Sequence, residues 1–98
     1  MEFRLAEHGL ILLTRVRGEA IREALLAELD AGETVVIDFG EVRNASYSFL
    51  DEFVGVLAAT LDPSPEFVNV PQKIADTIAE SLRNRGLDPS LAVSLEAA

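Results

Sequence analysis

Two serines and a tyrosine precede two carboxylates in the segment N-A-S-Y-S-F-L-D-E, and these side chains are the ones best suited to chemistry. Ser46 and Ser48 carry hydroxyls that can be phosphorylated or can bind backbone groups, and Tyr47 lies between them. Asp51 and Glu52 follow within one helical turn. The segment precedes a helical pattern, so it is expected at a helix N-terminus, where backbone N–H groups and the helix dipole favour anions.

The elements on either side of this segment position it. Residues 35–37 form an apolar run typical of a strand covered on both faces, and Asp38 follows at its carboxyl end. Residues 49–61 carry apolar side chains at three- and four-residue spacing, which predicts an amphipathic helix. Functional groups of α/β domains usually lie beyond the carboxyl ends of the strands. This rule favours residues 38–48 and the loop that contains Arg15.

The order of these residues resembles a known family. A strand that ends in D-F, a valine four residues after the aspartate, and S-x-S-F-L-D-E on the next helix are similar to the STAS-like domains, small bacterial relatives of the anti-sigma-factor antagonists. In those antagonists a strand that ends in D-L leads to D-S-S-G-L-G. Here Ser46 replaces the aspartate of that motif, Tyr47 the first serine, Phe49 the first glycine and Asp51 the second.

The resemblance implies a regulatory role. The second serine of the antagonist motif is phosphorylated by a partner kinase of the GHKL ATPase type, and Ser48 falls on that position. By the resemblance, Ser48 and Ser46 are the phosphorylation candidates. The surface expected to dock the partner includes the following residues: Arg15, Asp38, Tyr47, Ser48, Asp51 and Glu52.

The remaining pattern predicts a single α/β domain over residues 1–98, with a mixed sheet of about four strands packed on about three helices. A tight turn at residues 7–9 is expected to pair the first two strands as a hairpin. The strands are expected at residues 2–6, 10–14, 34–39 and 67–70, and the helices at residues 17–30, 49–61 and 71–85. Residues 87–98 are expected to form an edge strand, centred on 91–95, or a loosely ordered tail. The predicted core contains Val36, Ile37, Phe53, Leu57, Ile74 and Ile78.

Composition excludes several classes of protein. The net charge of −9 opposes binding to nucleic acid, which needs clustered Lys and Arg; it either favours a basic protein surface or serves solubility. The absence of cysteine removes disulfides and thiolate chemistry, and His8 alone cannot form a histidine cluster, so no metal or cofactor is expected. The sequence contains neither a membrane span nor an export signal, which predicts a cytoplasmic location.

Each candidate residue also has a structural interpretation. Ser48 and Asp51 match the S-x-x-[DE] capping box, in which each side chain binds the other residue's N–H. The carboxylates of Asp51 and Glu52 diverge by about 100° around a helix, so they cannot form an opposed catalytic pair and instead stabilise the first turn or face a partner. Asp38 is expected to fix its loop rather than to bind Mg²⁺.

Four further residues complete the predictions for side chains. Tyr47 either anchors its loop or is presented to a partner. His8 is expected to face solvent in a polar turn. Arg83 and Arg85 are expected to complement the C-terminus of the third helix.

Three classes of function follow, in order of preference. The first is a non-catalytic regulatory domain that docks a partner ATPase or kinase. The alternative is a nucleotide- or anion-binding module that uses the N-terminus of the second helix, although the glycine-rich cradle of a P-loop or dinucleotide site is missing. An enzyme comes third, because no histidine or lysine near the serines in sequence could activate them.

Overall fold

Three parallel strands each direct one large apolar side chain toward the helices in the computed structural model, which describes residues 1–90. Phe3 lies opposite Ile37, which lies opposite Phe67, and all three are buried. The strand order in this sheet is β1-β3-β5. The strands are β1 (Glu2–Arg4), β3 (Val36–Asp38) and β5 (Glu66–Val68). The predicted α/β class is confirmed.

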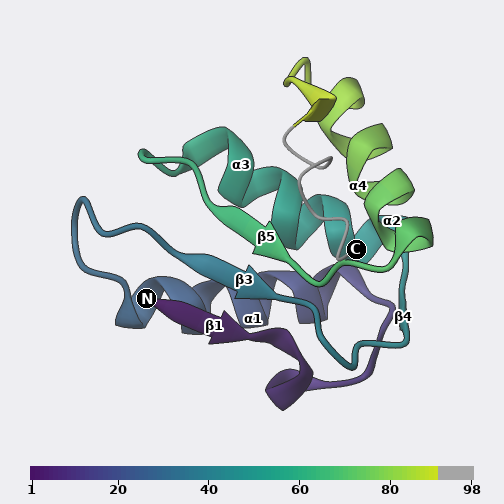
Figure 1. Ribbon diagram of the computed structural model, residues 1–98, viewed down its shortest axis with the longest axis horizontal. Helices are drawn as coiled ribbons and strands as arrows, with labels where there is room; N and C mark the ends of the chain where they lie inside the picture. Colours follow the sequence, from purple (N-terminus) through teal and green to yellow (C-terminus); the bar gives the residue numbers. More distant parts are fainter. Residues whose placement is uncertain (91–98) are drawn as a thin grey trace.

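Helices lie behind this sheet in Figure 1, and α4 lies beside the start of α2. The predicted first helix is confirmed with its bounds shifted by two residues, and the predicted second helix is a continuous run that contains one π-helical turn. The elements are α1 (Arg15–Glu28), α2 (Tyr47–Leu50), the π-helical turn η2 (Asp51–Gly55), α3 (Val56–Thr60) and α4 (Gln72–Asn84).

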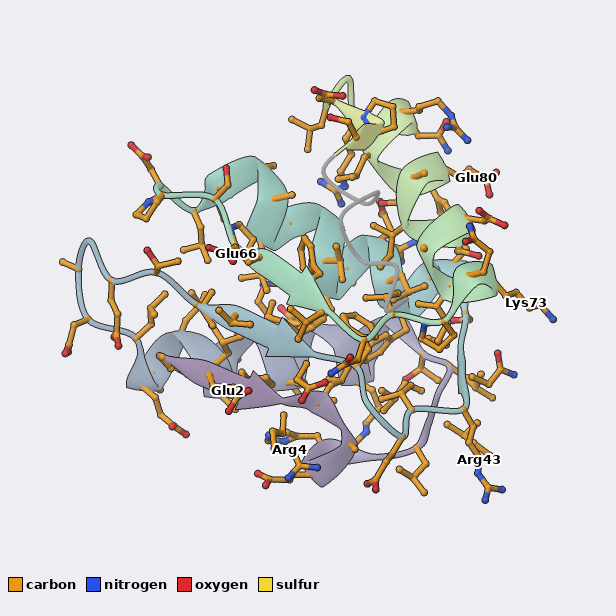
Figure 2. All side chains as sticks on the ribbon, viewed as in Figure 1. Glu2, Arg4, Arg43, Glu66, Lys73 and Glu80 are labelled. Atoms are coloured by element: carbon orange, nitrogen blue, oxygen red, sulfur yellow. The ribbon has the colours of Figure 1, made fainter. Side chains whose placement is uncertain are left out.

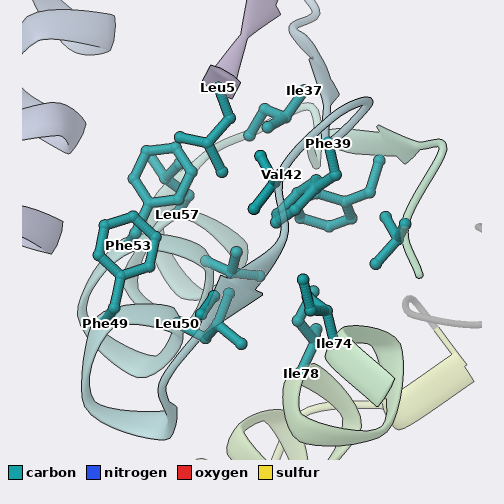
Figure 3. Packing of buried hydrophobic residues seen from close by; sticks show 14 of the residues in the cluster. Leu5, Ile37, Phe39, Val42, Phe49, Leu50, Phe53, Leu57, Ile74 and Ile78 are labelled. Carbon is teal, nitrogen blue, oxygen red and sulfur yellow. The ribbon is translucent and has the colours of Figure 1, made fainter. Parts of the chain in front are cut away.

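The core fills the space between the sheet and the helices. In Figure 3 the rings of Phe49 and Phe53 lie one above the other on the second helix, and their centroids are 5.6 Å apart. Ile74 and Ile78 point from α4 toward the same cluster. The predicted core is confirmed for Ile37, Phe53, Leu57, Ile74 and Ile78. Spacing of three and four residues places these helical side chains on inward faces.

Within residues 1–90, no helix or strand covers the opposite face of the sheet, which corrects one core prediction. Val36 is only half-buried, because neighbouring side chains of a strand point to opposite faces and Ile37 occupies the inward one. The expectation that this strand is covered on both faces is therefore wrong. Figure 2 shows Glu2, Arg4 and Glu66 on the open face.

The predicted hairpin of the first two strands is also wrong. The chain forms a 3-10 turn, η1 (Leu5–His8), and the next strand, β2 (Ile11–Leu12), pairs in parallel with β4 (Asn44–Ala45) in a separate sheet. Leu5 is fully buried, so the chain turns inward where a hairpin would have kept it extended. His8 is half-buried and stacks on Phe3, contrary to the expectation that it faces solvent.

Helix α4, which is the predicted third helix, agrees closely with its sequence pattern. Ile74, Ile78 and Leu82 are all buried, as their four-residue repeat predicts. Pro71 is the N-cap residue of α4 rather than a residue of its first turn. The strand predicted at residues 91–95 lies outside the described residues.

Candidate functional site

The second helix begins at a serine cap, and the cap is Ser46. Its hydroxyl accepts the N–H of Phe49 at 3.1 Å and donates to the carbonyl of Leu13 at 2.7 Å. The prediction that Ser48 caps the helix is wrong, because Ser46 is the last extended residue and Ser48 already lies within the first turn. The N–H of Asp51 donates to the backbone carbonyls of Tyr47 and Ser48 and so belongs to the helix backbone.

Tyr47 is held against the end of α4. Its hydroxyl accepts a hydrogen bond from the side-chain amide of Asn84 at 2.9 Å, and the residue is half-buried. Of the two interpretations from sequence, this contact supports the anchoring one. Tyr47 therefore fixes the position of α2 relative to α4.

Asp51 joins three helices through its carboxylate. It accepts hydrogen bonds from Ser81 Oγ at 2.7 Å, from Arg85 Nε at 2.8 Å and from Arg15 Nη1 at 2.9 Å. Arg15 begins α1, whereas Ser81 and Arg85 belong to α4 and its C-cap. The expected role of Arg85 at its own helix C-terminus is thus corrected: its guanidinium reaches across to Asp51. The side chain of Asp51 is only 13% exposed.

Glu52 continues the same network toward α1. Its carboxylate lies 3.0 Å from Nη1 of Arg22 and 3.3 Å from Nη1 of Arg15. Arg22 is largely buried, and it also donates to the backbone carbonyl of Glu52. Because Arg15 contacts both Asp51 and Glu52, the four charges form one continuous cluster between α1 and the second helix.

The arginines keep both carboxyl groups ionised. Hydrogen bonds from Arg85, then from Arg15 and Ser81, lower the pKa of Asp51 well below its ordinary range. Arg22, followed by Arg15, lowers the pKa of Glu52. A carboxylate that binds its proton so weakly is a poor general acid or base near neutral pH. The arrangement is therefore suited to holding helices together rather than to proton transfer.

Asp38 fixes the loop that follows β3. It accepts hydrogen bonds from the side-chain amide of Asn69 at 3.0 Å and from the N–H of Gly40 at 2.8 Å. These two bonds, the Asn69 bond first, lower its pKa. The predicted loop-fixing role is confirmed. Through Asn69, Asp38 also ties the end of β3 to the end of β5.

The structure brings most of the predicted site together, with one exception. Arg15, Asp51 and Glu52 are in direct contact, and Ser46, Tyr47 and Ser48 lie on the turn before them. Asp38 contacts the loop after β5 instead. Sequence reasoning did not connect four residues to the site: Arg22, Ser81, Asn84 and Arg85. Their contacts join positions 30 to 37 residues apart, so no local pattern could have revealed them.

Two further findings concern metal ions and membranes. Within residues 1–90, no group of three side chains from His, Cys, Asp and Glu could hold a metal ion. Across the same part of the chain, no helix is both long and apolar enough to cross a membrane.

One known family matches the sequence that forms β3 to β5 and the capped helix. A family model described as a STAS-like domain of unknown function (DUF4325) matches residues 17–77, which is more than half of the chain. The chain belongs to this family. The match covers α1 from residue 17, the Ser46 turn, the second helix and the beginning of α4, so it includes most of the site but not Arg15, Ser81 or Arg85. No curated protein and no solved structure matches the chain.

Proposed function

We propose that this STAS-like domain is a non-catalytic regulatory domain of the cytoplasm that docks a partner protein, an ATPase or kinase of the GHKL type, through the start of α2. Phosphorylation of Ser48 regulates the docking. The proposal extends the family assignment by the similarity of the Ser46 to Glu52 segment to the phosphorylated motif of the anti-sigma-factor antagonists.

One observation carries the choice of Ser48 over Ser46. The hydroxyl of Ser46 makes two hydrogen bonds, to Phe49 and to Leu13, and modification would break the helix cap. Among the described residues the Ser48 hydroxyl makes no hydrogen bond, and the residue is half-buried on the first turn. A kinase can therefore modify Ser48 without first dismantling the cap.

Helical spacing suggests how phosphate would act. Asp51 and Glu52 follow Ser48 by three and four residues, so the three side chains lie on neighbouring positions of the helix surface. A phosphate adds about −1.5 to −2 charges, which would repel both carboxylates and compete with them for Arg15. A partner fitted to the unmodified surface would be released, so phosphorylation would act as an off-switch.

The anion-binding alternative has less support. The Ser46 hydroxyl already occupies the N–H of Phe49, and Asp51 and Glu52 place two carboxylates in the first turns of the same helix. A bound anion would have to displace the cap and approach these charges.

The test uses a GHKL-type ATPase from the same organism, the purified domain and ATP. We expect phosphate on Ser48 by mass spectrometry, and binding weakened at least tenfold in Ser48→Asp by calorimetry. Ser64→Asp is the matched control, because it adds the same charge in the exposed loop after α3. If no such ATPase modifies the domain, and Ser48→Asp binds it as tightly as the unmodified domain, the proposal fails.

A further inference from the structure

Exposed apolar side chains are concentrated on β2 and the first turn of α1. Within residues 1–90, four of the five large apolar residues that remain exposed fall within seven consecutive positions, and Val16 is 76% and Ile11 60% exposed. The four form what we term the β2 surface: Leu10, Ile11, Leu13 and Val16. Scattered exposed apolar residues are ordinary, whereas a contiguous group marks an interaction surface.

The packing of α1 explains why the protein itself leaves this surface uncovered. Thr14 caps α1, so Leu13 precedes the cap and would normally pack against the fourth residue of the helix. That residue is Gly18, which has no side chain to offer. Gly18 cannot be larger, because a Cβ there would lie 2.9 Å from the carbonyl oxygen of Phe49. Close contact between the two helices thus leaves Leu13 exposed.

One edge of β2 is also free. β2 pairs with β4 on one side, through bonds such as the Ser46 N–H to the Leu12 carbonyl, and no other strand of residues 1–90 pairs with it. Leu12 points inward and is buried, whereas Ile11 points outward. An unpaired strand edge offers N–H and C=O groups to an incoming strand, and exposed side chains beside it select the incoming sequence.

Two exposed arginines, Arg17 and Arg43, lie beside this surface, although the chain has a net charge of −9. Of the three arginines in residues 9–18 and 42–50, which meet where β2 pairs with β4, Arg15 pairs with Asp51 and Glu52, whereas Arg17 and Arg43 form no salt bridge within residues 1–90. Arg17 donates to the carbonyl of His8, and the N–H of Arg43 donates to the carbonyl of Leu10, so both flank one end of β2. Figure 2 shows Arg43 extending away from the ribbon.

We propose that the β2 surface binds an extended segment of a protein partner that carries apolar and acidic side chains and adds as a strand to the free edge of β2. Apolar residues of the segment cover Ile11, Leu13 and Val16, and its carboxylates face Arg17 and Arg43. The proposal goes beyond the docking at Ser48 and does not depend on it.

Two other occupants fit less well. An anionic membrane would match the arginines and the apolar side chains, but lipid cannot pair with the backbone of an open edge, and the acidic remainder of the chain would be repelled. A second copy would present the same Arg17 and Arg43 in a two-fold dimer, which places like charges opposite one another.

A displayed library of random twelve-residue peptides, selected against the purified domain, tests the proposal. We expect enriched peptides that combine apolar residues with Asp or Glu. Ile11→Asp and Val16→Asp each place a carboxylate on the β2 surface. Synthetic copies of the enriched peptides should bind these variants at least tenfold more weakly than the unmodified domain. Arg43→Glu should weaken binding by a similar factor. Leu26→Asp and Arg83→Glu are matched controls elsewhere on the protein and should bind normally. Melting curves ensure that only folded variants are compared, and Val16→Asp, at the most exposed position, remains informative if Ile11→Asp unfolds.

Three outcomes would overturn the proposal. Enriched peptides without acidic residues, or binding unchanged in Val16→Asp and Arg43→Glu, would show that the surface does not select this chemistry. Flotation with vesicles of three parts phosphatidylcholine to one part phosphatidylserine, lost in Val16→Asp, would assign the surface to lipid. A dimer in sedimentation experiments that Val16→Asp dissociates would assign it to a second copy.

Discussion

The guanidinium of Arg85 passes directly over Gly55. A Cβ placed on Gly55 would lie 2.6 Å from Nε of Arg85 and 2.8 Å from Oγ of Ser81, which is closer than atoms of these kinds approach. Both side chains donate to Asp51. Because Gly55 has no side chain, it leaves room for the ion pair between Asp51 and Arg85 that connects α4 to the second helix. Asp51 and Gly55 are the first and last residues of the π-helical turn η2.

Gly55→Ala tests this relationship. An alanine in a helix is ordinarily more favourable than glycine by about 1 kcal/mol, but here its methyl group would displace Arg85 and Ser81 from Asp51. We expect a net loss of about 1–3 kcal/mol in the free energy of unfolding, measured in urea.

A mutant cycle supplies the control. In a protein that already carries Arg85→Ala and Ser81→Ala, the added methyl group meets neither side chain. There Gly55→Ala should be neutral or stabilising by about 0.5–1 kcal/mol. The same loss in both backgrounds would mean that the cost of the alanine does not arise from Arg85 and Ser81.

Stability should fall in acid, because the folded protein lowers the pKa of Asp51 below the ordinary value of 3.8. The unfolded chain takes up its proton first as the pH falls, so the stabilisation by Asp51 is complete above about pH 5 and decreases progressively below about pH 4. Asp51→Asn should lower stability at neutral pH by about 2 kcal/mol and should flatten the acid dependence.

Urea unfolding at a series of pH values measures this effect. Glu52, Asp38 and Glu33 also have lowered pKa values, so part of the slope will remain in Asp51→Asn. Glu19→Gln removes an exposed carboxylate on α1 and serves as the control. An unchanged slope in Asp51→Asn would show that Asp51 titrates alike in the folded and unfolded states.

Sequence reasoning succeeded where the deciding information is local. Ile74, Ile78 and Leu82 repeat with the helical period, and their burial follows from that spacing alone. The burial of Val36 was predicted wrongly, because it depends on elements that are distant in the sequence. Val35 and Ile37 beside it are as apolar as a fully covered strand requires, but whether any part of residues 1–90 covers the outer face depends on how distant elements pack.

The candidate site also has features that the local sequence could predict and features that it could not. The resemblance of the Ser46 to Glu52 segment correctly indicated a STAS-like domain. The choice between Ser46 and Ser48 as helix cap depended on where β4 ends, and β4 is too short for its sequence to predict. The partners of Asp51 could not be predicted, because Arg15 and Arg85 approach it from positions 36 residues before and 34 residues after it.

The two serines should differ in their effect on stability. Ser46→Ala removes the helix cap and the hydrogen bond to Leu13, so it should cost about 1–2 kcal/mol. Ser48→Ala removes a hydroxyl with no hydrogen bond among the described residues and should change stability by no more than about 0.5 kcal/mol. Urea unfolding of both variants checks the assignment. A larger loss of stability in Ser48→Ala than in Ser46→Ala would mean that Ser48, rather than Ser46, is the helix cap.

Phe53 should be the most sensitive position in the second helix. Its side chain is fully buried, and its ring lies 5.6 Å from that of Phe49 and 6.3 Å from that of Phe3. Phe53→Ala removes these contacts and leaves a cavity between the helix and the sheet, which should cost about 3–5 kcal/mol. A domain of this size has a total stability of about 5–15 kcal/mol, so the variant could approach complete unfolding.

Phe53→Leu keeps the measurement possible in that case, because it leaves a smaller cavity and should lose less stability than the alanine variant. Val16→Ala is the surface control: Val16 is 76% exposed, so its truncation should alter the free energy of unfolding by no more than about 0.5 kcal/mol. Thermal unfolding followed by circular dichroism should rank the melting temperatures with Val16→Ala highest, Phe53→Leu lower and Phe53→Ala lowest. If Phe53→Ala melts at the same temperature as Val16→Ala, Phe53 is not in the core and the inward face assigned to η2 is wrong.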